Sequence, residues 1–211
     1  MKKLKNVDFL LFDLGNVIIN IDYSFTINEL TKRLPKEKHS LTSEFFPAKF
    51  HKDYEKGLIS TVEFREAIKN HFQEPWEDNE IDYLWNSLLK DIPNDRIDLI
   101  KKLSEHYGLA VLSNTNELHI EAINILLKKQ FGVSSLHDIF DEVYFSHELQ
   151  LAKPDPNIYQ KVSELLATPP TNILFFDDLK DNIESAKNLG YQTHHVTHPQ
   201  ALISYFENVQ H

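Results

Sequence analysis

Short apolar runs alternate with amphipathic stretches along most of the chain. Five of the runs predict β-strands, and they cover Phe9–Leu14, Leu109–Ser113, Glu142–Ser146, Ile173–Asp177 and Gln192–Val196. Stretches with apolar residues at helical spacing precede or separate the last four runs, at Asp95–His106, Leu118–Lys129, Pro156–Leu166 and Lys180–Leu189. Because strands alternate with helices, the pattern predicts an α/β fold with a doubly wound, mainly parallel, Rossmann-like sheet.

The alternation is interrupted in the first half of the chain. After the first strand, the apolar positions follow helical spacing only, in the segments Phe25–Leu34, Ser43–Lys56, Thr61–Phe72 and Asn79–Leu89. We therefore predict an α/β core domain formed by residues 1–18 and 92–211, and a helical cap subdomain formed by residues 19–91. The cap would then be inserted directly after the first strand.

The charge balance narrows the classes of partner. The 211 residues carry a formal net charge of -10 and include no cysteine. An acidic chain lacks the basic face that nucleic acids and anionic membranes need, so we expect neither as a partner. The lack of cysteine excludes disulfides, thiolate nucleophiles and cysteine-bound zinc. The apolar run near the N-terminus is interrupted by Asp8 and Asp13, unlike a signal peptide, and we expect a cytoplasmic protein.

Polar side chains stand at the ends of three of the predicted strands. Asp13 comes at the end of the first run, the second run ends in Ser113 and Asn114, and the fourth ends in Asp177 and Asp178. Because the carboxyl ends of the strands share one edge of a doubly wound sheet, and ligands bind at that edge, we expect these residues to meet at one site.

Lys153 joins this set from the segment "LAKPDP", which follows the third strand. Pro154 favours an extended backbone at Lys153, and this can aim its ammonium group at the same edge. Three crowded aspartates call for a divalent cation, and Mg²⁺ prefers carboxylates together with water and phosphate oxygens. Ser113 and Lys153 are then suitable donors to a phosphate, and an aspartate can act as a nucleophile through an aspartyl phosphate.

These four segments, in this order, resemble the four motifs of the haloacid dehalogenase superfamily, most of whose members are magnesium-dependent phosphatases. The resemblance covers nearly the whole chain and includes the superfamily's small helical cap. The stretch "FDLGNV" also occurs in the bacterial sugar-phosphatase branch typified by alpha-D-glucose-1-phosphate phosphatase. The resemblance implies hydrolysis of a small phosphorylated metabolite, with sugar phosphates as the expected substrates, through an aspartyl-phosphate intermediate.

Each motif implies a role for the residues that match it. Asp13 is the expected nucleophile. The implied ligands of Mg²⁺ are the carboxylates of Asp13 and Asp178, the backbone carbonyl of Gly15, and Asp177 either directly or through water. The implied phosphate-binding residues are Ser113, Asn114 and Lys153, and Lys153 also neutralises charge during catalysis. Asn182 stands where many relatives carry a further aspartate. Its amide either holds a metal-bound water or is simply a polar group on the first turn of a helix.

Gly15 is the departure from the superfamily pattern. Many of its phosphatases carry an aspartate there, whose carboxyl protonates the leaving group and later activates water. Glycine does neither, and a general acid–base is typically worth about 10²–10⁴ in rate. The loss slows the enzyme, restricts it to good leaving groups, or is filled by a cap residue or by water.

Two other functions compete with the phosphatase hypothesis. A 2-haloacid dehalogenase also uses an aspartate nucleophile, but it needs no metal, so the acidic pair in "FFDD" argues against it. A non-catalytic sensor of phosphorylated ligands would keep the pocket without the acid. A turnover assay with and without magnesium separates all three.

Overall fold

A five-stranded parallel sheet forms the centre of the protein in the computed structural model, which describes residues 4–209. The strands are β1 (Phe9–Phe12), β2 (Gly108–Ser113), β3 (Glu142–Phe145), β4 (Ile173–Asp177) and β5 (Gln192–His195). Their spatial order is β3-β2-β1-β4-β5, and every neighbouring pair is parallel. The predicted doubly wound α/β fold is therefore confirmed. Since the chain order reverses at β1, the carboxyl end of this strand is where a ligand is expected to bind.

The register brings the ends of the three central strands level. Phe12 pairs with Val111 of β2 and with Phe176 of β4. The strand ends before the predicted Leu14, because the backbone turns there and the carbonyl of Leu14 accepts hydrogen bonds from Ile18 and Ile19. Asp13 still donates its backbone N–H to the carbonyl of Phe176 over 2.9 Å. This places the side chain of Asp13 at the edge of the sheet.

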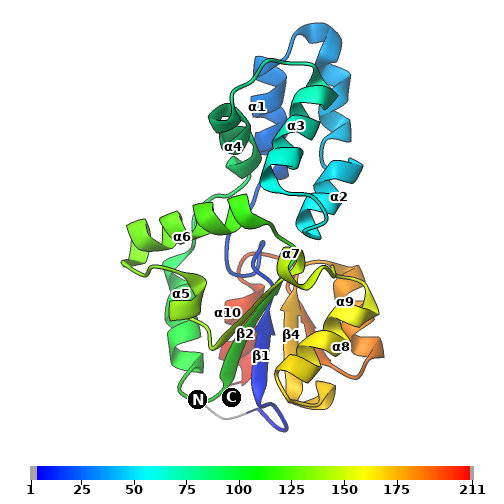
Figure 1. Cartoon of the computed structure of the whole chain (residues 1–211). Coiled ribbons are helices and arrows are strands. Elements are labelled where there is room, and N and C mark those ends of the chain that lie inside the picture. Colours follow the sequence, from blue (N-terminus) through cyan, green and yellow to red (C-terminus); the bar gives the residue numbers. More distant parts are fainter. Residues whose placement is uncertain (1–3, 210–211) are drawn as a thin grey trace.

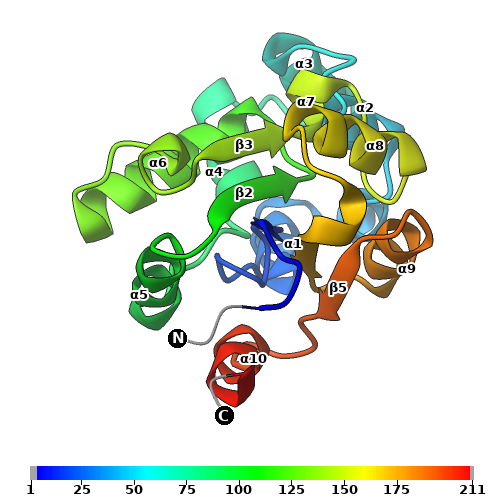
Figure 2. The same cartoon turned by 90° about the horizontal axis from the view of Figure 1, so that it is seen from below.

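Helices cover both faces of the sheet (Figure 2). The first face packs against α5 (Asn94–Leu103), α6 (Glu117–Phe131) and α10 (Ala201–Val209). The second packs against α8 (Pro156–Leu165) and α9 (Lys180–Asn188). Successive strand residues point to opposite faces, so Leu10 and Phe12 belong to the first cluster, whereas Leu11 belongs to the second. This burial on both faces explains why the strands are continuously apolar.

The helical insert has its own hydrophobic cluster. It contains α1 (Tyr23–Arg33), a 3₁₀ helix (Lys36–Glu44), α2 (Lys49–Glu55), α3 (Thr61–Phe72) and α4 (Asp78–Asn86). Figure 1 shows α1 to α4 together beyond the carboxyl ends of the strands. All of these elements fall within the predicted cap of residues 19–91, whose boundaries stay a prediction.

The prediction of one continuous helix over Ser43–Lys56 was wrong. A 3₁₀ helix ends at Glu44, and α2 begins only at Lys49. Pro47 lies between them, and a proline has no N–H to donate inside a helix. Among the described elements, the sequence reading also missed α7 (Ser146–Leu149), α10 and two short 3₁₀ helices. None of the helices described over residues 4–209 is long and apolar enough to cross a membrane.

Candidate active site

The three predicted carboxylates meet at the carboxyl end of the sheet. Asp13, Asp177 and Asp178 each offer an oxygen, and these three atoms lie within 4.8 Å of one another. A cavity of about 210 Å³ opens beside them. Its lining includes five further residues of the predicted site, namely Gly15, Ser113, Asn114, Lys153 and Asn182. The structure thus brings together segments that are more than 160 residues apart in the sequence.

Lys153 is buried among acceptors. Its Nζ lies 2.8 Å from Asp13 Oδ1, 2.7 Å from Asp177 Oδ2 and 2.8 Å from the carbonyl oxygen of Leu112. An ammonium group has three hydrogens to donate, and here three protein acceptors surround it. Its predicted charge-neutralising role fits this geometry. Direct donation to a phosphate would require Lys153 to exchange one of these partners.

Asp177 is completely buried and already well bonded. One oxygen accepts from the backbone N–H of Leu179 over 2.8 Å, and the other from Lys153. The amide of Asn182 donates to both oxygens, over 2.9 and 3.0 Å. The geometry therefore suits Asp177 to orient Lys153 and to reach a metal through water. Asn182 lies on the first turn of α9, as one of its two expected roles has it, and its donor group is directed at Asp177.

Burial raises the pKa of Asp13 to about 7. Lys153 opposes this shift, whereas the nearby charges of Asp177 and Asp178 add to it. A divalent cation would offset this repulsion. Carboxylate oxygens grouped beside a polar cavity are the ligands that Mg²⁺ prefers, so Asp13 and Asp178, with the carbonyl of Gly15 at the same cavity, fit a magnesium site.

The two residues that end β2 lie differently at the cavity. The side chain of Asn114 bonds the backbone of Lys153, with Nδ2 donating to its carbonyl and Oδ1 accepting from its N–H, each over 2.8 Å. It therefore fixes the position of Lys153, and any contact of Asn114 with a phosphate would come from its backbone. Ser113 lines the cavity, where its hydroxyl suits the predicted contact with a phosphoryl oxygen.

Asn16 is a site residue that the sequence reading missed. Its Nδ2 donates to Asp178 Oδ2 over 3.0 Å, and its Oδ1 accepts from the backbone N–H of Ile21 over 3.2 Å. The residue has a φ of 55°, a left-handed conformation that asparagine tolerates better than most residues. Its place in "LGN", directly after the glycine, was the available signal.

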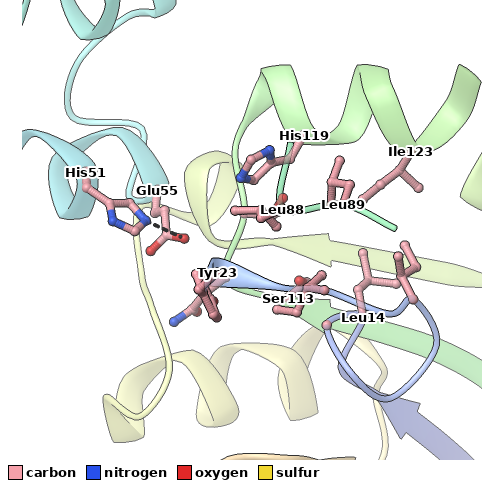
Figure 3. Close-up of a pocket in the computed structure, with 14 residues that line it drawn as sticks. Leu14, Tyr23, His51, Glu55, Leu88, Leu89, Ser113, His119 and Ile123 are labelled. Atoms are coloured by element: carbon pink, nitrogen blue, oxygen red, sulfur yellow. Dashed lines mark ion pairs between the residues drawn. The ribbon is translucent and has the colours of Figure 1, made fainter. Parts of the chain in front are cut away.

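The cap supplies a second group of residues that the sequence reading did not identify. Tyr23, His51 and Glu55 line the nucleophile's cavity. They also line a smaller adjoining pocket of about 60 Å³, whose wall includes Leu88 and His119 (Figure 3). His51 and Glu55 stand four residues apart, on one face of α2. Because the sequence analysis did not predict the break at Pro47, it could not predict that this face of α2 is directed at the cavity.

Comparisons with known proteins show which family the chain is similar to. The family of haloacid dehalogenase-like hydrolases matches residues 7–190. The chain is 26% identical over 192 residues to the D-ribitol-5-phosphate phosphatase of Bacteroides thetaiotaomicron. The aligned region covers 90% of each chain. It is also 28% identical over 135 residues to a phosphorylated carbohydrates phosphatase of Thermotoga maritima. That aligned region covers 64% of this chain and 58% of the relative.

Solved structures show the same likeness. One is a HAD family enzyme of Bacteroides thetaiotaomicron in complex with magnesium and inorganic phosphate. It has a TM-score of 0.80 at 34% identity, over 90% of this chain and 93% of that one. A HAD-like family hydrolase of Porphyromonas gingivalis has a TM-score of 0.87 at 24% identity over 98% of each chain, a likeness of fold. With its family match over most of its length, the chain belongs to the haloacid dehalogenase-like hydrolases.

Proposed function

We propose that the protein is a magnesium-dependent phosphatase that hydrolyses small phosphorylated sugars through an aspartyl phosphate on Asp13. The observation that carries the proposal is the grouping of Asp13 with Asp177, Asp178 and Lys153 at the sheet's carboxyl edge. A relative of known structure holds magnesium and inorganic phosphate, and two relatives are phosphatases of sugar-derived phosphates. The same acidic group argues against a dehalogenase, which has no use for a metal site.

In the first step, an oxygen of Asp13 attacks phosphorus and the bond to the leaving oxygen breaks. In the second, water attacks the phosphorus, the bond to Asp13 breaks, and inorganic phosphate leaves. Lys153 stays beside Asp13 and offsets the negative charge that gathers there. A bound Mg²⁺ would supply charge stabilisation to the phosphoryl oxygens and would be held by Asp13, Asp178 and the carbonyl of Gly15.

The cavity supports a small substrate. Its volume of about 210 Å³ is below the usual range for drug-sized ligands, about 300–1,000 Å³. We propose sugar or sugar-alcohol phosphates as the substrate class, and among them the sugar 1-phosphates that the stretch "FDLGNV" suggests. The adjoining pocket, lined by Leu88, Leu89 and His119, would then receive part of the sugar.

Phosphate release from a panel of phosphorylated metabolites tests the proposal. We expect turnover with magnesium, none after chelation, and recovery when magnesium is added back. Asp13→Asn and Asp178→Ala should both reduce turnover to background. Asp181→Ala is the matched control, since Asp181 is exposed on α9 and lies outside the cavity lining. Phosphate release that survives chelation would contradict the dependence on magnesium. Halide release from a 2-haloacid, with no phosphate release from any metabolite, would favour a dehalogenase, and phosphate binding without turnover would favour a sensor.

A further inference from the structure

Position 15 carries a glycine, so it offers no side chain for the proton transfers of the proposed reaction. The leaving oxygen needs a proton as its bond to phosphorus breaks, and the attacking water must later lose one. A positioned acid–base group typically contributes about 10²–10⁴-fold to such steps. A group in the cavity lining that holds and exchanges a proton would replace the missing side chain.

His51 and Glu55 form a close pair at the wall of this cavity. His51 Nδ1 lies 2.7 Å from the carbonyl oxygen of Phe46. Because a carbonyl only accepts, Nδ1 carries a hydrogen and donates it. On the other side of the ring, Nε2 lies 3.1 Å from Glu55 Oε1. At this distance the two side chains form an ion pair whenever the imidazole is protonated, and a proton can pass between Nε2 and Oε1.

Contacts between cap and core hold this pair over the strand ends. The hydroxyl of Ser146 in the core donates to the backbone carbonyl of Glu55. Gly57 packs so closely on the core that a Cβ there would lie 2.1 Å from the carbonyl oxygen of His147. The end of α2 is therefore seated directly on α7, which follows β3.

Tyr23 lies in the same cavity as the His51–Glu55 pair and the nucleophile. Its side chain lines the same cavity. Its pKa is raised by desolvation and then by the charges of Glu55, Asp13 and Asp178. The carboxylates of Glu55 and Asp13 thus both act on Tyr23, and all three residues line the cavity in which a substrate would bind.

We propose that the His51–Glu55 pair is the general acid–base of the reaction, which rests on the proposed phosphatase function. As Asp13 bonds to phosphorus, the electron pair of the breaking bond stays on the leaving oxygen, which takes the proton held by the pair. The attacking water then gives a proton to the pair while its oxygen bonds to phosphorus and the bond to Asp13 breaks. Alcohol and phosphate leave in turn, and the pair ends in its starting protonation state.

Other candidates for this role in the cavity lining are poorly suited. Burial lowers the pKa of His119 to about 3, helped by the charge of His51, so its imidazole has no additional proton to give near neutral pH. The ammonium group of Lys153 is engaged with three protein acceptors. The raised pKa of Tyr23 makes its hydroxyl a weak acid.

Leaving-group dependence tests the proposal. The substrates are p-nitrophenyl phosphate, whose leaving group needs little protonation, and a sugar phosphate that the wild type hydrolyses. With magnesium present, His51→Gln and Glu55→Gln should each lose about 10²-fold or more in kcat/KM on the sugar phosphate, and clearly less on p-nitrophenyl phosphate. The comparison uses kcat/KM because it reports the steps up to departure of the leaving group, whereas kcat also includes hydrolysis of the aspartyl phosphate, which both substrates share. His39→Gln and Glu66→Gln are the matched controls, because these cap residues lie outside the cavity lining.

A rescue variant separates a chemical role from a structural one. Gly15 has no left-handed φ, and a Cβ there would meet only the Ile21 side chain, at 3.0 Å from Cδ1. Adding Gly15→Asp, with Ile21→Val for space, to Glu55→Gln should restore part of the rate on the sugar phosphate.

Two outcomes would overturn the inference while leaving the proposed function standing. One is an equal loss on both substrates without rescue, and the other is no loss on either. If the wild type itself releases no phosphate from any monoester with magnesium, the proposed function fails, and the assignment of the pair fails with it.

Discussion

At position 13, the fold buries a carboxylate next to two others with one lysine to offset them. The folded state holds the proton of Asp13 more tightly than the unfolded chain does, because its pKa rises from 3.8 to about 7. Between these two values the unfolded chain has released a proton that the folded protein still binds. The contribution of Asp13 to stability is therefore present below about pH 4 and is lost as the pH rises through about 7.

We therefore predict that Asp13→Asn stabilises the metal-free protein above pH 7. The asparagine keeps the shape of the side chain but carries no charge to repel Asp177 and Asp178. Thermal unfolding in chelator, measured from pH 5 to pH 8, should show that the melting temperature of the variant exceeds that of the wild type by an amount that grows with pH. Added magnesium should reduce this difference in melting temperature, because it stabilises the wild type. A difference independent of pH would contradict the raised pKa of Asp13.

Sequence reasoning located the residues whose place depends on strand ends alone. Asp13, Ser113, Asp177 and Asp178 come together because parallel strands share an edge, and Lys153 because its segment follows β3. Its assignment of individual bonds was weaker. The predicted contact of Asn114 with phosphate specifies no atom of the residue, and its side chain bonds the backbone of Lys153. Which donor meets which acceptor depends on side-chain directions that periodicity does not encode.

At the scale of elements, α2 is the cap helix that brings His51 and Glu55 to the wall of the active-site cavity. The predicted long helix would have carried His51 and Glu55 on a different axis. The break at Pro47 lets a short helix turn so that these two residues face the strand ends, and Gly57 then ends it against α7. Apolar spacing predicted that helices form here. It did not predict the break, although Pro47 is a local signal for one. The contact between Gly57 and the core, which helps to set where α2 lies, leaves no such signal.

Gly57→Ala should displace the end of α2. Gly57 has a φ of 64°, and a Cβ would lie 2.1 Å from the carbonyl oxygen of His147, which cannot move freely because it is backbone. We expect a lower melting temperature, a raised KM and a reduced kcat, because both cap and pair shift away from Asp13. Gly132→Ala is a matched control, since Gly132 has a similar φ of 70° but no atom within 4 Å of the added Cβ.

The control carries the backbone cost alone, about 1–2 kcal/mol for a side chain in the left-handed region. Gly57→Ala should exceed it in stability loss and, unlike the control, should change the kinetics. Equal effects of the two substitutions on both melting temperature and KM would show that close contact between Gly57 and α7 has no part in seating the cap.

On the scale of the whole molecule, two hydrophobic cores meet at one cavity. Apart from Leu118 of α6, the buried residues of the cap cluster come from residues 30–85, and those of the two sheet clusters come from the segments on either side, which is why apolar patterning predicted two parts. Their relative placement follows from a few polar and close contacts, such as Ser146 with Glu55, that leave no periodic trace in the sequence. The cavity between them, and hence the choice of substrate, could not be predicted for the same reason.

This arrangement predicts selection by size. The cavity holds about 210 Å³ between the cap and the strand ends, and α2 is seated on the core at its wall. A phosphorylated side chain on a folded protein cannot bring its phosphorus to Asp13 without lifting the cap, and lifting the cap would also withdraw His51 and Glu55. A misplacement of about 1 Å can cost about 10²-fold in rate.

We therefore expect kcat/KM for small sugar phosphates to exceed that for a folded phosphoprotein by at least about a hundredfold. Phosphate release from both substrates measures the ratio, and Gly57→Ala should reduce it by loosening the cap. Comparable rates on the two substrates in the wild type would mean that the cap does not restrict access to Asp13.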